Sequence, residues 1–301
     1  MNYIFSNKVR DNDILRESFN KLTRQTFGFD FINWYALGHW GKWYIPQALL
    51  DGEKVVSNVS VNLMQFDMQG VQKNYIQLGT VMTDKDYRGQ GLNRQIMERV
   101  LEEYVGKVDG IYLFGNDEVL DYYPKFGFQA SKEYEYYMSL GSEDVGKLIP
   151  YALEKVDMSD KEQSEQIVKI IKAYPDNSGE VNENDGLYMS ENLGLYQFWL
   201  DAAYANQVYY VPEVGVYVIA EWEKQVLRIH QIFGKQRVDI PRLAQSFEEQ
   251  VQEVVLGYVP MDKTPFRVRE HKEEDCTLFI LGEDLEGIEN EKLMFPILSH
   301  A

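Results

Sequence analysis

The sequence predicts a mixed α/β protein of two halves, each with a mostly antiparallel sheet flanked by helices. Strand-like runs alternate with segments whose apolar residues recur at helical spacing. A glycine-bearing loop joins a predicted strand to a predicted helix near Val81 and Leu92. The second half also repeats the element order of the first, which suggests an internal duplication. Because 301 residues suffice for two domains, we expect domains at 1–141 and 150–301, separated by the segment 141–150.

The first half starts with a short strand, Tyr3–Ser6, and a helix from about Asp11. Three strand-like runs follow, and Asp51-Gly52 joins the first two in the manner of a hairpin turn. These runs are Tyr44–Leu50, Lys54–Phe66 and Tyr75–Met82. After the helix from Leu92, the pattern predicts a buried strand, a short helix and a closing strand: Gly110–Phe114, Glu118–Tyr123 and Glu133–Leu140.

The pattern of the second half predicts the same order of strands and helices as that of the first half. A strand and two helices come first: Tyr151–Val156, Lys161–Tyr174 and Glu191–Ala205. Three strands follow: Val208–Val211, Val214–Trp222 and Val226–Phe233. A helix over Ile240–Val255 and strands at Thr277–Leu281 and Leu293–Leu298 complete it.

Composition excludes several classes of protein. The 45% apolar and 26% charged content is that of a globular protein, and the single cysteine, Cys276, excludes a disulfide framework. No apolar run is long enough to span a bilayer, and the start of the sequence is too polar for a signal peptide, so we expect a soluble cytoplasmic protein without a membrane partner. The net charge is 16 − 20 = −4 over residues 1–150 and 14 − 28 = −14 over residues 151–301. This excess of acid argues against nucleic acid and permits a cationic partner.

The segment Arg88-Gly89-Gln90-Gly91-Leu92 is the most informative in the chain. Its glycines allow a tight turn and close approach of a ligand to the backbone. The helix that begins there leaves N–H groups unpaired and has positive dipole character at that end, which suits a phosphate or pyrophosphate. The loop is neither a Walker A motif nor a dinucleotide fingerprint.

Together, Tyr87-Arg-Gly-Gln-Gly-Leu92 after a strand, Asn116 after the next strand, and Tyr-x-Lys-x-Gly-Phe at Tyr123–Phe128 resemble the signatures of the GNAT N-acetyltransferases. The resemblance covers residues 45–140 best. It implies a GNAT fold for the first half and suggests a tandem protein whose second half is degenerate, because Gly234–Arg242 offers one glycine where the loop would recur. An unrelated α+β domain is the alternative for the second half.

The resemblance also implies an acetyl-CoA site and a general acid. The pantetheine arm would pair with the strand at Val81, Met82 and Thr83, and the pyrophosphate would rest on the loop. Its loop residues are Arg88, Gly89, Gln90, Gly91, Leu92 and Asn93, with Arg94 close by and Asn116 beyond the second strand. Tyr123 matches the tyrosine that protonates the leaving thiolate. Asn93, Lys85 and Gln77 depart from the family pattern, which prefers Gly or Ala, Pro and Glu at these places.

The departure at Gln77 removes a base from the mechanism, because an amide cannot take the proton of an attacking amine. His39 is the candidate replacement, since its ordinary pKa suits a base near neutrality. His300 and the terminal carboxylate of Ala301 are further candidates if the last strand reaches the first half. The aromatic side chains of Trp34, Tyr35 and Trp40 would either bind the acceptor or pack in the core.

These patterns predict an acetyl-CoA-dependent N-acetyltransferase acting on a primary amine of a small molecule or peptide, by direct attack in a ternary complex. No His, Asp and Glu residues have convincing metal-ligand spacing, so no metal is expected. Two alternatives stay open. One is a non-catalytic acyl-CoA sensor on the same fold, and the other is a transferase that uses a different acyl donor.

Overall fold

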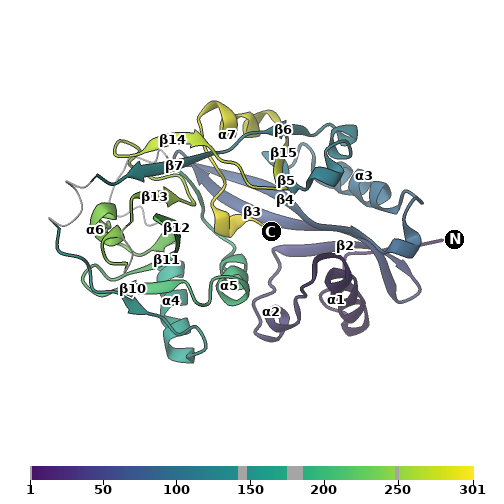
Figure 1. Cartoon of the computed structure of the whole chain (residues 1–301). Helices are drawn as coiled ribbons and strands as arrows, with labels where there is room; N and C mark the ends of the chain where they lie inside the picture. The colour runs from purple at the N-terminus through teal and green to yellow at the C-terminus, as the bar shows by residue number, and fades with distance from the viewer. Residues whose placement is uncertain (1, 142–147, 175–185, 248–250) are drawn as a thin grey trace.

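Two mixed sheets lie side by side in the computed structural model, which describes residues 2–141, 148–174, 186–247 and 251–301. Helices flank both sheets, and each sheet with its helices forms one lobe of the molecule. The C-terminus lies between the two lobes (Figure 1). The predicted mixed α/β class and mostly antiparallel sheets are confirmed. Within the described ranges, no helix combines the length and apolar character needed to cross a bilayer.

The first sheet carries strands from both ends of the chain. In spatial order they are β1 (Ile4–Ser6), β2 (Tyr44–Asp51), β3 (Lys54–Met68), β4 (Val71–Thr83), β5 (Gly110–Gly115), β15 (Thr277–Leu281) and β6 (Gln129–Ser131). A short strand, β9 (Leu187–Met189), pairs with β3 off this path. Neighbours are antiparallel except β4 and β5, which run parallel.

The second sheet has the same pattern. Its order is β14 (Arg267–Glu270), β7 (Tyr134–Ser139), β13 (Glu253–Leu256), β12 (Val226–Phe233), β11 (Val216–Glu223), β10 (Val208–Val211) and β8 (Glu154–Lys155). Here too one pair, β12 and β13, is parallel. Counted from β1 in the first sheet and from β8 in the second, the fourth and fifth strands form the parallel pair, and two further strands follow them.

The two halves exchange a strand. The predicted closing strand of the first half is β7, and it pairs with β13 and β14 of the second sheet. The second half returns β15, which inserts between β5 and β6 of the first sheet. Periodicity identifies a strand but not its partner, so the sequence alone could not show this exchange. The division at 141 and 150 stays a prediction, and residues 142–147 of the expected boundary lie outside the described residues.

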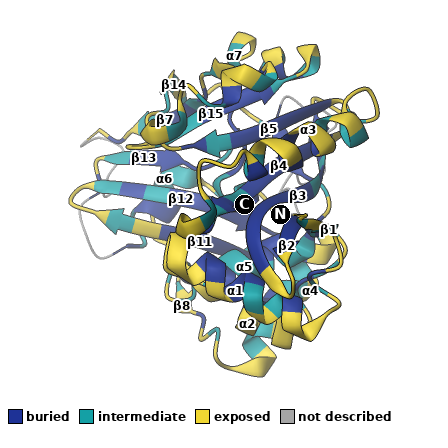
Figure 2. Cartoon of the chain, turned by 90° about the vertical axis from the view of Figure 1, so that its right-hand side faces the viewer, coloured by how far each residue is buried: buried dark blue, intermediate teal, exposed yellow. Residues whose placement is uncertain are grey.

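Seven α-helices are assigned in the described residues: α1 (Asp13–Phe27), α2 (Ile32–Ala36), α3 (Leu92–Tyr104), α4 (Lys161–Ala173), α5 (Leu193–Ala202), α6 (Ile240–Ala244) and α7 (Gly287–Asn290). Asn12 caps α1 through bonds from Ile14 N and Leu15 N, and Gly28 ends it in the left-handed conformation. The apolar side of α3 packs on one face of the first sheet, and α1 packs on the other face. The central strands are buried, whereas the outer surfaces of α3 and α7 are exposed (Figure 2).

Two second-half predictions were wrong. The helix expected over Ile240–Val255 ends at Ala244, and Glu253–Leu256 forms β13 instead, while residues 248–250 lie outside the described residues. The strand expected at Leu293–Leu298 is irregular chain that ends in a turn of 3₁₀-helix at Ile297–Ser299. Glu253–Leu256, at the end of the expected helix, and Leu293–Leu298 are both short and largely apolar, and periodicity does not assign such runs to one type of structure.

Candidate active site

The two parallel strands of the first sheet separate at their carboxyl ends. Their register pairs end at Leu78 and Leu113. Beyond that pair β4 continues to Thr83 and β5 to Gly115. Within the part of the chain that the structure describes, the edge of β4 that faces β5 therefore has no strand partner over its last residues, so its backbone groups are available to a ligand between the strands. Val81, Met82 and Thr83 lie on this stretch.

A bulge bends β4 where the separation begins. Thr80 has φ = 40°, and the β3–β4 register shifts between Asn58 and Ser60. Side chains hold this left-handed residue: the Thr80 hydroxyl donates to Ser60 Oγ (2.6 Å) and lies 2.6 Å from the Tyr44 hydroxyl, while Asn58 Nδ2 donates to Thr80 O (3.0 Å). A β-branched residue is rarely found at positive φ, and such strain persists where its surroundings over-determine it. The bulge redirects the end of β4 away from β5.

The predicted glycine loop follows β4 and lies exposed at the surface. Gly89 has φ = 75° and Gly91 has φ = 71°, and no atom lies within 4 Å of the Cβ position of either. Backbone conformation, not lack of space, therefore requires glycine here. Asp84 begins the loop by accepting the Asp86 N–H (3.0 Å), and Arg88 Nε donates to Thr83 O (3.3 Å). These bonds hold the loop against the end of β4.

Helix α3 begins directly after this loop without a side-chain cap. Gly91 is the N-cap residue, and it offers no acceptor to the N–H groups of the first turn. Arg94 adds an exposed cation in that turn, 3.5 Å from Glu98. The exposed, uncapped start of a helix is an anion-binding arrangement.

Asn93, the departure from the family pattern, links three segments around the separated strands. Its Oδ1 accepts the Tyr122 hydroxyl (2.6 Å) and its Nδ2 donates to Asn58 O on β3 (3.3 Å). Burial raises the pKa of Tyr122 to about 12, so its hydroxyl remains a donor at neutral pH. Sequence reasoning missed this link, and the unusual residue at position 93 was its only signal.

Tyr123 lies under the carboxyl end of β5. It is 4% exposed, and a Cβ on Gly115 would lie 3.0 Å from its ring, so glycine at that position allows the close approach. The Tyr123 ring centroid is 5.3 Å from that of Phe279 on the exchanged strand β15. Burial raises the pKa of Tyr123 well above its usual value. The phenol therefore keeps its proton at neutral pH. Asn116 lies exposed at the end of β5.

The carboxyl end of the chain reaches the separated strands. Gln77 Nε2 donates to Ala301 O (3.4 Å), and Gln77 Oε1 accepts the Tyr112 hydroxyl (3.4 Å). A Cβ on Gly79 would lie 2.8 Å from Ala301 O. The His300 ring stacks on Phe114 with 3.9 Å between centroids. Burial lowers the pKa of His300 to about 3, which keeps its imidazole neutral.

The aromatic segment before β2 lies mainly in the core. Trp34 and Trp40 are 7% and 4% exposed and stack with 5.6 Å between centroids. Tyr35 is exposed and carries Arg16 over its ring at 3.6 Å. His39 Nδ1 lies 3.3 Å from Asp201 Oδ2, on helix α5 of the other half. These observations place His39 against α5, and the roles predicted for the four residues stay predictions.

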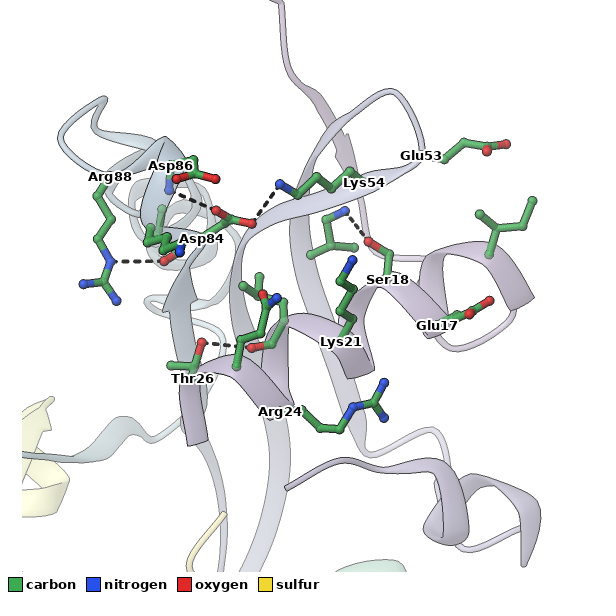
Figure 3. A pocket seen from close by; sticks show the side chains of 16 residues that line it. Glu17, Ser18, Lys21, Arg24, Thr26, Glu53, Lys54, Asp84, Asp86 and Arg88 are labelled. Carbon is green, nitrogen blue, oxygen red and sulfur yellow. Dashed lines mark hydrogen bonds and ion pairs between the residues drawn. The ribbon is translucent and has the colours of Figure 1, made fainter. Parts of the chain in front are cut away.

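A cavity of about 800 Å³ lies beside the glycine loop, between α1 and the β2–β3 turn (Figure 3). Its lining carries charges of both signs: Lys54 pairs with Asp84 (2.8 Å), and further lysine and arginine side chains line it together with Glu17, Glu53 and Asp86. Arg24 pairs outward with Asp30 (2.6 Å). The cavity lies next to the loop and not between the separated strands, and its mixed lining selects neither cations nor anions.

In the second sheet, the end of the parallel pair β12–β13 and the helix that follows β12 differ from the end of β4–β5 and the start of α3. Helix α6 has five residues, and the Asp239 side chain caps it by accepting the Arg242 N–H (2.9 Å). Gly234, the glycine before it, has φ = 145° and lies against Val216. Beyond the last β12–β13 pair, Ile297 N donates to Gly257 O (2.9 Å). The chain's own groups occupy the positions that are open in the first sheet.

Comparison with known proteins agrees with this geometry. Residues 12–131 match the family model described as an acetyltransferase (GNAT) domain. A conserved Enterococcus faecalis V583 protein of unknown function is 17% identical over 95% of this chain and 74% of its own, with a TM-score of 0.59. A GCN5-related N-acetyltransferase from Kribbella flavida (15% identity, 94% and 72%, TM-score 0.54) and one from Anabaena variabilis ATCC 29413 (11%, 93% and 72%, 0.53) are also similar. At such identities these structures show the fold.

Proposed function

Residues 12–131 of this chain match the GNAT acetyltransferase domain, and on that premise we propose that the chain transfers an acetyl group from acetyl-CoA to a primary amine. One observation carries the proposal: an exposed glycine loop and an uncapped helix start adjoin two separated strands. Acetyl-CoA, when bound, supplies an activated acetyl thioester. The residues present fit it, because the loop offers backbone N–H groups to phosphates and β4 offers unpaired edge groups to the amide-bearing arm.

Each predicted binding residue has a defined task in this proposal. The amides from Arg88 to Asn93 hold the pyrophosphate, and the side chains of Arg88 and Arg94 add positive charge. Val81, Met82 and Thr83 pair through their backbone with the pantetheine arm. A β4 backbone N–H in this stretch stabilises the developing negative charge on the carbonyl oxygen of the acetyl group. Asn116 contacts the cofactor beyond β5.

Tyr123 is the proposed general acid. Its raised pKa leaves the proton on Oη at neutral pH, where it can pass to the leaving sulfur. The position under the end of β5 supports this role, since the separated strands end beside it.

The proton of the attacking amine needs an acceptor, and Gln77 cannot serve. His300 is a weak base with its pKa near 3, and His39 lies against Asp201 of α5. The Ala301 carbonyl oxygen lies beside Gln77 and Gly79. We therefore keep His39, the base predicted from the sequence, as the proposed acceptor. His39→Ala should lower turnover at least about tenfold, and unchanged turnover would reject that assignment.

The deciding experiment is calorimetric titration of acetyl-CoA into the wild type and a Gly91→Glu variant. The variant places an anion in the proposed phosphate site and should abolish binding. Gly215→Glu is the matched control: Gly215 has φ = 63° and the same open surroundings, but it lies in the β10–β11 hairpin. Equal binding by wild type and Gly91→Glu would reject the site.

A panel of amines then separates the enzyme from the acyl-CoA sensor. Gln77, in place of the family's base, is the observation that keeps the sensor in consideration. Saturable release of free CoA thiol with any amine supports the transferase. Cofactor binding without release across the panel supports the sensor.

A further inference from the structure

A series of side-chain hydrogen bonds connects the two sides of the separated strands in the first sheet. It begins in the turn after β5, where the Tyr122 hydroxyl donates to Asn93 Oδ1 (2.6 Å). Asn93 Nδ2 donates to Asn58 O on β3 (3.3 Å), and Asn58 Nδ2 donates to Thr80 O at the bulge of β4 (3.0 Å). The series therefore runs from the β5 side of the gap, through the first turn of α3, to the β4 side.

The Tyr122 end of this series reaches the proposed general acid. The Tyr122 ring makes T-shaped contacts with the Tyr123 ring, at 5.3 Å between centroids, and with the Phe126 ring, at 5.1 Å. The Tyr122 backbone N–H bonds to Val119 O (2.9 Å) in the same turn. A half-buried ring that is bonded at its hydroxyl and packed between two other rings has little freedom to move. Its position therefore restrains that of Tyr123.

The Asn58 end of the series reaches the bulge of β4. Asn58 is fully buried, and its Nδ2 donates to Ser60 Oγ (2.9 Å) as well as to Thr80 O. Ser60 Oγ also accepts the Thr80 hydroxyl (2.6 Å). These bonds fix the left-handed Thr80, and the backbone N–H groups assigned to the acetyl carbonyl follow it directly along β4.

In the proposed reaction, the two ends of the series act on neighbouring atoms of one thioester. A β4 backbone N–H after Thr80 stabilises the carbonyl oxygen, and the Tyr123 phenol protonates the sulfur. Misplacing a reacting group by about 1 Å can cost about 10²-fold in rate. Beyond the last register pair no described strand joins β4 to β5, so side-chain bonds and packing set the distance between these groups. Glycine or alanine at position 93 would offer no side-chain donor or acceptor for this purpose.

We propose that Asn93 is a positioning residue, which holds the turn that carries Tyr123 at a fixed distance from the bulge of β4. This inference rests on the proposed acetyl transfer, because it assigns the Asn93 side chain a task in that reaction. The side chain acts through Tyr122 and Asn58. The task is separate from that of the Asn93 backbone N–H, which belongs to the proposed phosphate site.

Single-turnover acetylation of the most active amine of the panel tests this task. Asn93→Ala retains the backbone N–H and removes both side-chain bonds. It should lower the transfer rate about tenfold and leave the calorimetric Kd of acetyl-CoA within about threefold of the wild-type value. Tyr122→Phe removes the bond to Asn93 from the other side, so the Asn93→Ala/Tyr122→Phe double variant should be about as active as Asn93→Ala alone. Gln95→Ala, which removes an exposed amide from the same helix, is the control and should match the wild type.

The Tyr123→Phe background separates positioning of the acid from a general structural effect. Where the acid is absent, its position no longer matters, so adding Asn93→Ala should cause no further loss of rate. A further tenfold loss in that background overturns the proposal. An unchanged rate when Asn93→Ala is made alone also overturns it.

Hydrogen exchange measured by mass spectrometry distinguishes the failure of this proposal from the failure of the proposed function. The amides of residues 117–126 should exchange about fivefold faster in Asn93→Ala and Tyr122→Phe than in the wild type and Gln95→Ala. Equal exchange in all four proteins overturns the positioning role, even where the enzyme is active. Faster exchange in a protein that transfers no acetyl group retains the role of Asn93 in holding this turn and rejects the transferase.

Discussion

The two lobes have the same strand pattern but use it differently. In the first, α3 starts at an uncapped glycine, and among the described residues no strand pairs with the facing edges of β4 and β5 beyond Leu78 and Leu113. In the second, Asp239 caps the short α6, and Ile297 bonds to Gly257 beyond the parallel pair. The second lobe satisfies internally the groups that the first leaves open. We therefore expect a ligand site in the lobe whose backbone groups are unsatisfied, although the strand order of the two lobes is alike.

The largest effect should follow from separating the lobes. Residues 1–150 expressed alone lack β15, which pairs with both β5 and β6 and brings Phe279 against Tyr123. Without it, two strand edges are exposed to wrong pairing. We expect this fragment to aggregate or to show no cooperative thermal transition by circular dichroism. A soluble monomer with a sharp transition would show that the strand exchange is not needed for the first lobe.

A catalytic difference between the lobes is tested by two tyrosines whose pKa values are raised. Tyr123→Phe should lower turnover about 10²–10⁴-fold with little change in acetyl-CoA affinity, if Tyr123 supplies the proton. Tyr258 of the second lobe is half-buried, desolvation raises its pKa, and Tyr258→Phe should leave turnover unchanged. Steady-state kinetics with one amine measures both. Equal losses in the two variants would attribute the effect to packing.

The lobes also meet at a pair of carboxyl groups with opposite behaviour. Burial raises the pKa of Glu133 to about 7. Glu135 is also partly buried, but the hydrogen bonds from His271 and Arg269 outweigh that and lower its pKa to about 2. In the unfolded chain both groups titrate near 4.5. The stability that Glu133 contributes is therefore present below pH 4.5 and lost as the pH rises through 7, whereas that of Glu135 is present above 4.5 and lost as the pH falls towards 2.

Urea unfolding across this pH range checks both signs. Glu133→Gln should remove the decline in unfolding free energy between pH 4.5 and 7, relative to the wild type. Glu135→Gln should flatten the decline below pH 4.5 and lower stability at neutral pH, since it removes one of the two carboxylate partners of Arg269 and the carboxylate partner of His271. If a variant's plot of unfolding free energy against pH ran parallel to that of the wild type, the pKa shift assigned to that glutamate would be contradicted.

Local features of this chain could be predicted from its sequence, and long-range partners could not. The strands Val208–Val211, Val226–Phe233 and Thr277–Leu281 were predicted with the bounds that the structure shows, because β-branched runs between turn signals are local patterns. The glycine loop was also found locally. The insertion of β15 beside β5 depends on contacts between residues more than 150 positions apart. The same is true of a cavity beside β5, which Ser131 and His271 line together.

The smallest effect concerns the two helix starts. Asp239→Ala removes the cap of α6 and should lower unfolding free energy by about 1 kcal/mol without changing acetyl-CoA affinity. Gly91→Ala should lower stability by a similar amount, because alanine at φ = 71° is strained, but it should also weaken acetyl-CoA binding by shifting the loop amides. Unfolding curves measured with and without acetyl-CoA separate these contributions, since the stabilisation by a bound ligand rises with the logarithm of its affinity when the ligand is in excess. If the ligand raised the stability of both variants equally, the start of α3 would be no more a phosphate site than that of α6.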